Sequence, residues 1–391
     1  MPLPSQRDLF DLPRNITYFN AAYIGPLART TVAAGEAGIR LKSAPWAIAA
    51  PDFFMRSDRV RGLAAQLYGA SANDIAFVPS VSYGTALAAR NIVVQPGQTI
   101  LCLEDQFPSH VYVWRRMAEE RDGAVVTVRR DAAQTASGAP DWTAALLAAI
   151  DDRTAAVAVP HCHWTDGSLI DLAAVGQAAR HHGAALVLDL TQSLGALPFS
   201  VTTVDPDFAI SASYKWQLGP YSLGTLYAAP RHHHAGRPLE ESWMTRAGAE
   251  NFARLVDYQD TYQPGARRFD VGETANFHLM PMLEAALVQL LDWGVDQIAE
   301  TLSAMTATIA ERAEAEFGLA SVPREQRAGQ FLGLTFPDGL PEGLVEQLKA
   351  SNVFVSVRGT SMRVTPHVYN DADDTERLFE ALAQVMRCRA A

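Results

Sequence analysis

The chain has 391 residues, of which 48% are apolar and 19% charged, and its formal net charge at pH 7 is −11. This is the composition of an ordinary folded protein. Because the length exceeds the roughly 250–300 residues at which a single hydrophobic core stops growing, we expect two domains. The acidic balance argues against a nucleic-acid partner, since binding a polyanion needs a strongly basic face.

Cysteine usage and hydropathy exclude further classes. The three cysteines are an odd number, lie far apart and form no CxxC pattern, which argues against a disulfide scaffold or a structural zinc site. The N-terminus lacks the apolar run of a secretory signal. No uninterrupted apolar stretch reaches the length of about 18 residues that a membrane span requires. We therefore predict a cytoplasmic protein that does not bind membranes.

Between residues 70 and 230, short apolar runs alternate with amphipathic stretches. We expect strands at 75–78, 100–103, 125–128, 155–159, 185–188, 208–211 and 225–227. Helices are expected at 84–91, 110–120, 142–150 and 172–182. This alternation predicts an α/β fold with a mostly parallel seven-stranded sheet covered by helices on both faces. Ligands of such sheets bind beyond the carboxyl ends of the strands.

The pattern changes beyond residue 280. Helices are expected at 282–293, 295–317, 341–349 and 374–386, and short strands at 331–336, 353–357 and 362–365. These elements predict a small α+β C-terminal domain. We divide the chain into an N-terminal arm (1–17), a large domain (18–264) and a small domain (265–391), with the arm packing back on the small domain.

Two charged residues follow strands of the predicted sheet. Asp189 ends an apolar run, where a buried carboxylate needs a partner such as a protonated pyridinium nitrogen, although aspartates often end strands in α/β enzymes. Lys215 lies between Tyr214 and Trp216, where desolvation would make its amine nucleophilic. A surface lysine is the alternative interpretation. Of the three lysines in the chain, however, only Lys215 falls in the sheet region.

Two further segments indicate anion binding. Residues 80–85 place small hydroxyl side chains and Gly84 at a helix N-terminus, where free backbone N–H groups favour a phosphate; a simple N-cap is the alternative. Arg363 lies at the edge of a strand in the small domain. Its planar guanidinium could bind the α-carboxylate of an amino acid, or it could form a surface salt bridge.

In order and spacing, these segments resemble the class V aminotransferase family of fold-type I pyridoxal-phosphate enzymes. That family includes cysteine desulfurases, selenocysteine lyases, kynureninases and isopenicillin-N-epimerase-like proteins. The resemblance covers nearly the whole chain. It lies in the segments 18–22 (YFNAA), 189–195 (DLTQSLG), 214–220 (YKWQLGP), 268–276 (RFDVGETAN) and 363–370 (RVTPHVYN).

The resemblance implies pyridoxal 5'-phosphate as the cofactor, a small amino acid as the substrate, and a homodimer with its active sites at the interface. The catalytic residues would be Lys215, which forms the Schiff base and moves protons, and Asp189, which keeps the ring nitrogen protonated. The remaining cofactor-binding residues would be Ser82, Tyr83 and Tyr214 at the phosphate, Gln192 at the phenolic oxygen, Phe107 on the ring, and Thr274 at a phosphate across the interface. The candidate substrate-binding residues are Arg363, Asn20 and His163.

The chain also departs from the family pattern. The loop ahead of Arg363, residues 357–361, holds no cysteine, whereas persulfide-forming desulfurases need a thiol nucleophile there. Where desulfurases have a histidine and an asparagine, this chain has Tyr214 and Trp164. We therefore expect lyase-type chemistry, either β-elimination or C–S or C–C cleavage. Transamination and epimerisation are the alternatives.

Other classes of protein fit the sequence less well. A non-catalytic binding protein with this fold would not require Lys215, Asp189 and Arg363 together. A dinucleotide-binding oxidoreductase is disfavoured because no glycine-rich fingerprint follows an early strand. The run His232-His233-His234 could suggest a metal, but adjacent histidines on a loop are more often exposed, and we predict no metal site.

Overall fold

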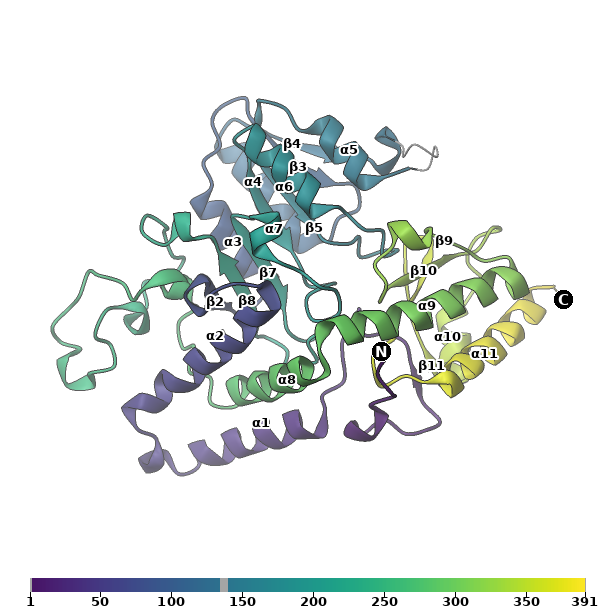
Figure 1. Cartoon of the computed structure of the whole chain (residues 1–391), viewed down its shortest axis with the longest axis horizontal. Coiled ribbons are helices and arrows are strands. Elements are labelled where there is room, and N and C mark those ends of the chain that lie inside the picture. Colours follow the sequence, from purple (N-terminus) through teal and green to yellow (C-terminus); the bar gives the residue numbers. More distant parts are fainter. Residues whose placement is uncertain (1, 134–139, 391) are drawn as a thin grey trace.

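The computed structural model describes residues 2–133 and 140–390. A seven-stranded sheet forms the centre of its larger part (Figure 1), with the strand order β2-β8-β7-β6-β5-β3-β4. Its strands are β2 (Ile75–Val78), β3 (Thr99–Leu103), β4 (Ala124–Val128), β5 (Thr154–Pro160), β6 (Ala185–Asp189), β7 (Phe208–Ala212) and β8 (Gly224–Ala228). The strand β8 runs antiparallel to both of its neighbours, β2 and β7, and the other neighbouring strands of this sheet are parallel. The predicted α/β fold with a mostly parallel seven-stranded sheet is therefore confirmed.

Burial explains why these strands could be located in the sequence. Every residue of β2, β3, β5, β7 and β8 is buried. Strands covered on both faces read as continuous apolar runs, because neither face can carry polar side chains. The strand β4 lies at the sheet edge and is mostly exposed.

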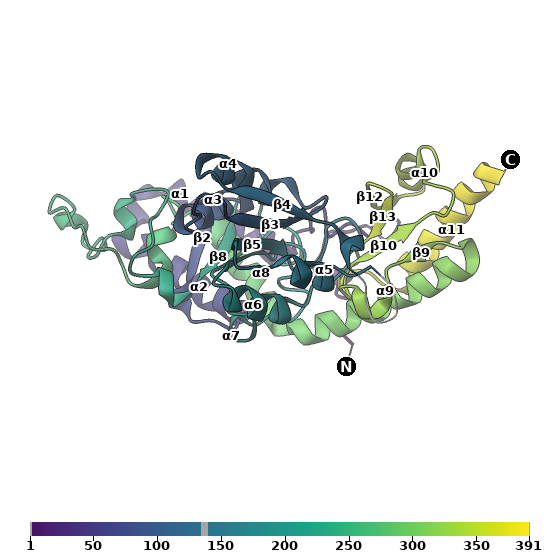
Figure 2. The same cartoon turned by 90° about the horizontal axis from the view of Figure 1, so that it is seen from above.

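Helices cover both faces of the sheet (Figures 1 and 2). The helices α3 (Val81–Asn91) and α4 (Tyr112–Glu120) contribute to one core cluster. The opposite cluster takes its residues from α2 (Met55–Tyr68), α5 (Trp142–Ala149), α6 (Leu172–His181), α7 (Val201–Val204) and α8 (Leu279–Trp293). Gly84 lets α3 approach β7 closely, since a Cβ there would lie 2.8 Å from Cγ2 of Ile210.

Two helices, α1 (Arg29–Lys42) and α2, lie outside the predicted elements. The helix α1 contains Gly35 and Gly38, which disfavour helix in isolation. Both face the segment that begins α8: a Cβ on Gly38 would lie 2.0 Å from the carbonyl oxygen of Phe277, and one on Gly35 would lie 2.7 Å from Sδ of Met282. The glycines therefore serve close helix packing, which single-sequence propensity does not reveal.

The smaller part of the molecule contains a four-stranded antiparallel sheet in the order β12-β13-β10-β9. Its elements are α9 (Val295–Phe317), β9 (Ala320–Ser321), β10 (Leu332–Thr335), α10 (Leu344–Ala350), β11 (Val353–Phe354), β12 (Ser356–Arg358), β13 (Ser361–Val364) and α11 (Ala372–Ala390). The predicted strand 353–357 is wrong as a single element, because β11 leaves this sheet and pairs in parallel with β1 (Thr17–Tyr18).

The N-terminal residues contact the small sheet and its helices. Beyond the β1–β11 pair, Asn20 bridges to Thr365, and Arg7 forms a buried ion pair with Asp374 at 2.9 Å. The helix α8 packs against α1 and α2, although it follows the proposed boundary at residue 265. The exact domain limits stay a prediction. Across residues 2–133 and 140–390, none of the helices has the length and hydropathy to cross a bilayer.

A buried ion pair joins α2 to the segment before α8, and its loss should destabilise the fold. Arg61 donates to both carboxylate oxygens of Asp270 at 3.1 and 2.8 Å, and the same carboxylate accepts the N–H of Phe77. Removing one partner leaves the other charge buried and alone. We expect Asp270→Ala to lower the free energy of unfolding in urea by about 3–5 kcal/mol.

The control is Glu119→Ala, which breaks an exposed pair with Arg116 and should change stability by less than about 1 kcal/mol. Equal effects of the two substitutions would contradict the structural importance of the buried pair.

Candidate active site

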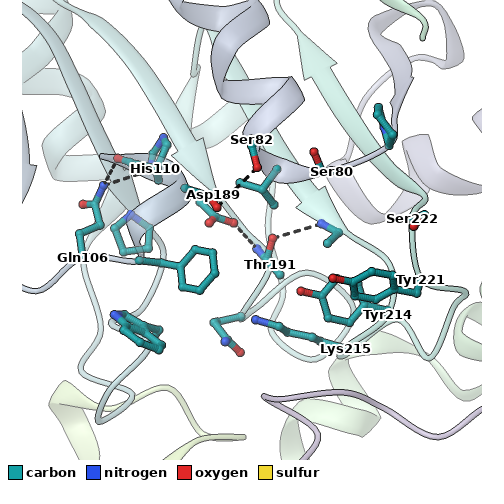
Figure 3. A pocket seen from close by; sticks show the side chains of 18 of the residues that line it. Ser80, Ser82, Gln106, His110, Asp189, Thr191, Tyr214, Lys215, Tyr221 and Ser222 are labelled. Carbon is teal, nitrogen blue, oxygen red and sulfur yellow. Dashed lines mark hydrogen bonds between the residues drawn. The ribbon is translucent and has the colours of Figure 1, made fainter. Parts of the chain in front are cut away.

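A cavity of about 230 Å³ lies at the carboxyl edge of the central sheet (Figure 3). The segments that follow β2, β3, β5, β6 and β7 all reach it, as does the segment before the antiparallel β8. Its polar lining consists of Ser80, Ser82, Gln106, Ser109, His110, Cys162, Asp189, Thr191, Gln192, Tyr214, Lys215, Tyr221 and Ser222. The structure therefore places the cavity where parallel strands direct ligands.

Lys215 lies three residues after β7 and is 7% exposed. Its backbone is held in place because its carbonyl accepts the N–H of Leu218 and because Gly25 donates to the carbonyl of Tyr214 at 2.8 Å. Burial lowers the pKa of the Lys215 amine to about 8; the charges of Arg363 and Arg358 also lower it, and Asp189 opposes the shift. A larger share of the amine is therefore neutral and nucleophilic near neutral pH than for an ordinary lysine.

Asp189 ends β6 and is also 7% exposed. Its Oδ1 accepts the N–H of Thr191 at 2.9 Å, and the Thr191 hydroxyl accepts the N–H of Ala212 at 3.1 Å, which ties the ends of β6 and β7 together. Within residues 2–133 and 140–390 no basic side chain forms a salt bridge with Asp189. A buried carboxylate that lacks a cation fits a ligand bearing a protonated nitrogen.

The N-terminus of α3 forms another wall of the cavity. Ser80 is the N-cap, and its hydroxyl accepts the N–H of Tyr83 at 3.1 Å. In the part of the chain that the structure describes, the N–H groups of Val81 and Ser82 have no protein acceptor. Ser82 and Ser109 place hydroxyl groups beside them, 3.5 Å apart. Free N–H groups at the positive end of a helix suit a phosphate.

Aromatic and amide side chains complete the cavity. The Phe107 ring lies 5.5 Å from Nζ of Lys215 and meets the Trp164 ring edge to face at 5.3 Å. The Tyr214 ring lies 5.7 Å from the same Nζ. Gln192 accepts from the Trp216 indole at 3.0 Å and donates one amide hydrogen to the Ala22 carbonyl at 3.1 Å. One N–H of the Gln192 amide is left for a ligand.

Arg363 and Asn20 do not line this cavity, but they lie beside one of its walls. Arg363 is 1% exposed and donates to the Ser356 hydroxyl at 3.0 and 2.7 Å and to the Trp164 carbonyl at 3.0 Å. The Ser356 hydroxyl in turn donates to Asn20 at 2.8 Å. Three of the five guanidinium N–H donors are thereby used. No carboxylate of the described residues forms a salt bridge with Arg363, so its charge fits a carboxylate ligand.

Besides Arg363 and Asn20, three further predicted residues lie outside the cavity lining. His163 stacks on Trp142, and its ring nitrogens lie 2.6 Å from the Thr165 hydroxyl and 3.0 Å from the Glu104 carbonyl. Thr274 is buried and donates to the sulfur of Met244. Tyr83 is absent from the cavity lining, and its N–H is taken by Ser80. Their proposed roles stay predictions.

The histidine run after β8 has structural partners. His232 lies 2.8 Å from Asp207 Oδ1 and packs on Phe208, while His233 lies 2.9 Å from the Ala228 carbonyl. Within residues 2–133 and 140–390 no group of three potential ligands is arranged to hold a metal ion.

Several lining residues were missed by the sequence reasoning, among them Thr191, His110 and Ser222. Thr191 follows Asp189 by two residues at a strand end, and this spacing could have indicated it. His110 is buried, its Nδ1 lies 3.1 Å from Gln106, and its Nε2 has no hydrogen-bond partner among the described residues. Burial lowers the pKa of His110 to about 4, so its ring is neutral. Ser222 adopts a left-handed conformation with φ of 64°, which nothing in the sequence indicates.

Comparison with known proteins shows the family. Residues 52–378 match the family described as Aminotransferase class-V. The kynureninase of Deinococcus radiodurans is 32% identical over 319 residues, which cover 78% of this chain and 73% of that protein. The chain belongs to the aminotransferase class V family. It is accordingly a pyridoxal-phosphate-dependent enzyme, which confirms the resemblance and the cofactor predicted from the sequence.

Two further matches extend over nearly the whole chain. The isopenicillin N epimerase of Amycolatopsis lactamdurans is 25% identical, with 97% of this chain and 98% of that protein covered. The apo structure of a cysteine desulfurase from Thermococcus onnurineus NA1 superposes with a TM-score of 0.83 at 17% identity and covers 99% of this chain and 100% of that one. At that level of identity, the structural likeness shows the fold.

The residues of the cavity fit this cofactor. Asp189 is a buried carboxylate available to a protonated ring nitrogen, and Lys215 is a buried amine available to an aldehyde carbon. The N–H groups of Val81 and Ser82 are available to a phosphate. The described part of the chain gives none of these groups a charged protein partner, which is consistent with their serving a ligand.

The lowered pKa of Lys215 can be tested without cofactor. Only the neutral amine reacts with formaldehyde and cyanoborohydride, so methylation of Lys215 in the apoprotein should rise with pH through a midpoint near 8. Because Asp189 raises this pKa, Asp189→Asn should move the midpoint to lower pH. Peptide mass spectrometry resolves the three lysines, and exposed Lys349 serves as internal reference. A midpoint near that of an ordinary lysine, about 10.4, would contradict the burial of the amine.

Proposed function

We propose that the protein catalyses a lyase-type reaction on a small amino acid, either β-elimination or cleavage of a C–S or C–C bond. An amino-acid substrate is supported most strongly by the juxtaposition of the buried Lys215 amine, the Asp189 carboxylate and a guanidinium, Arg363, that lacks an acidic partner in the described structure. The Lys215 amine suits the aldehyde of the cofactor, and the Asp189 carboxylate suits its ring nitrogen. The Arg363 guanidinium suits the carboxylate of an amino-acid substrate. The 32% identical kynureninase favours lyase chemistry over the alternatives.

Each residue would have a defined task. The cofactor supplies an electron sink for a carbanion at the substrate Cα. Asp189 holds the proton on the ring nitrogen, which keeps that sink effective. Lys215 accepts the proton from Cα and returns a proton at Cα or Cβ. Arg363 would fix the substrate carboxylate and thereby orient the substrate in the site.

We propose further that the protein is not a persulfide-forming desulfurase. The strands β12 and β13 form a hairpin whose turn is only Gly359 and Thr360, and it holds no cysteine. Cys162 lines the cavity, but its thiol donates to the Gln192 carbonyl, and burial raises its pKa far above the usual range. A thiol in this environment is a poor nucleophile.

The epimerase relative, which matches almost the full length, makes epimerisation the second candidate. Epimerisation and lyase chemistry would both begin with removal of the Cα proton by Lys215. In epimerisation a proton then returns to the opposite face of Cα, whereas in a lyase reaction a bond to the side chain breaks. Transamination is the third candidate, because it needs the same residues together with a keto acceptor.

We also propose that the enzyme is a cytoplasmic homodimer. Large apolar side chains are exposed on α1, on the loop that follows it and at the start of α2, including Ile39, Trp46 and Met55. Residues Val256 and Tyr258, on a second loop that extends from the body of the molecule (Figure 1), are also exposed. The exposed apolar side chains on these two segments support association with a second copy. Thr274 would then reach the phosphate of the other subunit.

The spectrum of the purified protein tests the role of Lys215. With pyridoxal phosphate, the wild type should show a visible absorbance band that borohydride bleaches, and Lys215→Ala should lack it, because the covalent link requires that amine. Lys349→Ala, on the surface, is the control and should keep the band. A colourless wild type after cofactor addition would overturn the proposed function.

Acceptor dependence separates lyase from aminotransferase chemistry. Incubated with a panel of amino acids, the enzyme should release a keto acid or amine product together with a leaving group in the absence of any keto acceptor. Products are identified by mass spectrometry. Strict dependence on an added keto acid would show transamination, and loss of optical activity without a released group would show epimerisation.

A further inference from the structure

We propose that Arg358 forms a second anion-binding position beside Arg363, so that the preferred substrate is an amino acid with an acidic group on its side chain. This inference rests on the proposed function, because it assigns the substrate class of that same site.

The register of the β12–β13 hairpin puts the two arginines on one face. Ser356 pairs with Arg363, and Arg358 pairs with Ser361. Paired residues of antiparallel strands share a face, as do residues two apart on one strand. Arg358 and Arg363 are therefore diagonal neighbours on the same side of the hairpin.

This face is directed at the cavity. Gly333, which pairs with Arg363, packs against the segment after β5: a Cβ on Gly333 would lie 2.6 Å from Cα of Asp166. Two residues earlier in that segment is Trp164, which lines the cavity. Figure 2 shows β12 and β13 on the side of the small domain nearest the large one.

Both guanidinium groups lie at the same aromatic ring. The Cζ atom of Arg358 is 5.6 Å from the centre of the Trp164 ring, and that of Arg363 is 5.9 Å from it. Both charges also act on the Lys215 amine, which places them within electrostatic range of the reacting end of the cavity. Two like charges this close repel each other unless an anion lies between or beside them.

No such anion is supplied by the described residues. Arg358 donates only to the Val357 carbonyl, at 2.7 Å, and neither arginine forms a salt bridge with a described carboxylate. The nearby Asp166 is already paired with Arg130 at 3.2 Å. The hydroxyl of Ser361, opposite Arg358, is buried and lacks a hydrogen-bond partner in the same part of the chain.

One α-carboxylate satisfies one of these cations. Arg363 is the more buried of the two and is fixed by Ser356, which suits the constant group of the substrate. Arg358 is half-buried and, among the described residues, donates only to a backbone carbonyl, so it can adjust to a side-chain carboxylate or sulfinate. A substrate with a neutral side chain would leave Arg358 without an anion and would therefore bind more weakly than an acidic one. This difference in affinity would let the site discriminate between acidic and neutral substrates.

The test compares isosteric acid and amide ligands on the holoenzyme. Titration of the cofactor absorbance with aspartate, asparagine, glutamate and glutamine gives a half-saturating concentration for each. In the wild type we expect at least one acid to bind about tenfold or more tightly than its amide. Arg358→Gln should reduce that ratio to less than about threefold, and Arg358→Lys should restore part of it. Arg363→Lys should weaken acid and amide alike.

Succinate provides a readout that is independent of turnover. Calorimetry should show succinate binding to the wild-type holoenzyme and to the surface control Arg116→Gln, and much weaker binding to Arg358→Gln. Equal affinity for acid and amide, or an unchanged ratio in Arg358→Gln, would overturn the acidic-substrate inference and leave the proposed function intact. If no cofactor band forms at all, the proposed function fails first and the inference with it.

Discussion

The active site depends on two opposite charges, Asp189 and Lys215, that are buried at the ends of neighbouring strands without protein ion-pair partners among the described residues. Burying such groups is costly unless a ligand compensates them. The Thr191 bridge between β6 and β7 fixes their relative position through backbone hydrogen bonds. The sheet therefore presents an anion and an amine at a separation set by strand geometry, and pyridoxal phosphate supplies a complementary nitrogen and aldehyde.

The rest of the fold brings other charges to the same edge. The helix α3 packs closely against β7 because Gly84 has no side chain, and its N-terminus lines the cavity. The N-terminal segment joins the two sheets, because Asn20 pairs with Thr365 while Gly25 holds the backbone beside Lys215. Through the β12–β13 hairpin, the small domain adds positive charge opposite the cofactor site. Under the proposed function, the small domain would bind the substrate carboxylate, while the large domain carries Lys215 and Asp189.

Much of this arrangement could be predicted from the sequence. Buried strands read as apolar runs, and the exposed β4 is rich in β-branched valine and threonine, so all seven central strands were located to within one residue at each end. Asp189 and Lys215 stood out as charges at or just after strand ends. The glycine-rich α1 was missed because its helix depends on packing against α8. Contacts between segments far apart in the sequence could not be predicted from the sequence either. Spacing suggested His163 for the cavity, but its ring is used by Thr165 and Glu104.

The protonation of the cofactor ring tests the central role of Asp189 most directly. In holoenzyme prepared with pyridoxal phosphate labelled with nitrogen-15, the ring-nitrogen signal should lie at the protonated position across the neutral pH range. The isosteric Asp189→Asn should move it towards the unprotonated position, because the amide carries no charge to hold the proton. An unprotonated signal in the wild type, or the same signal in both proteins, would contradict the assignment of Asp189 as the ring's counter-ion.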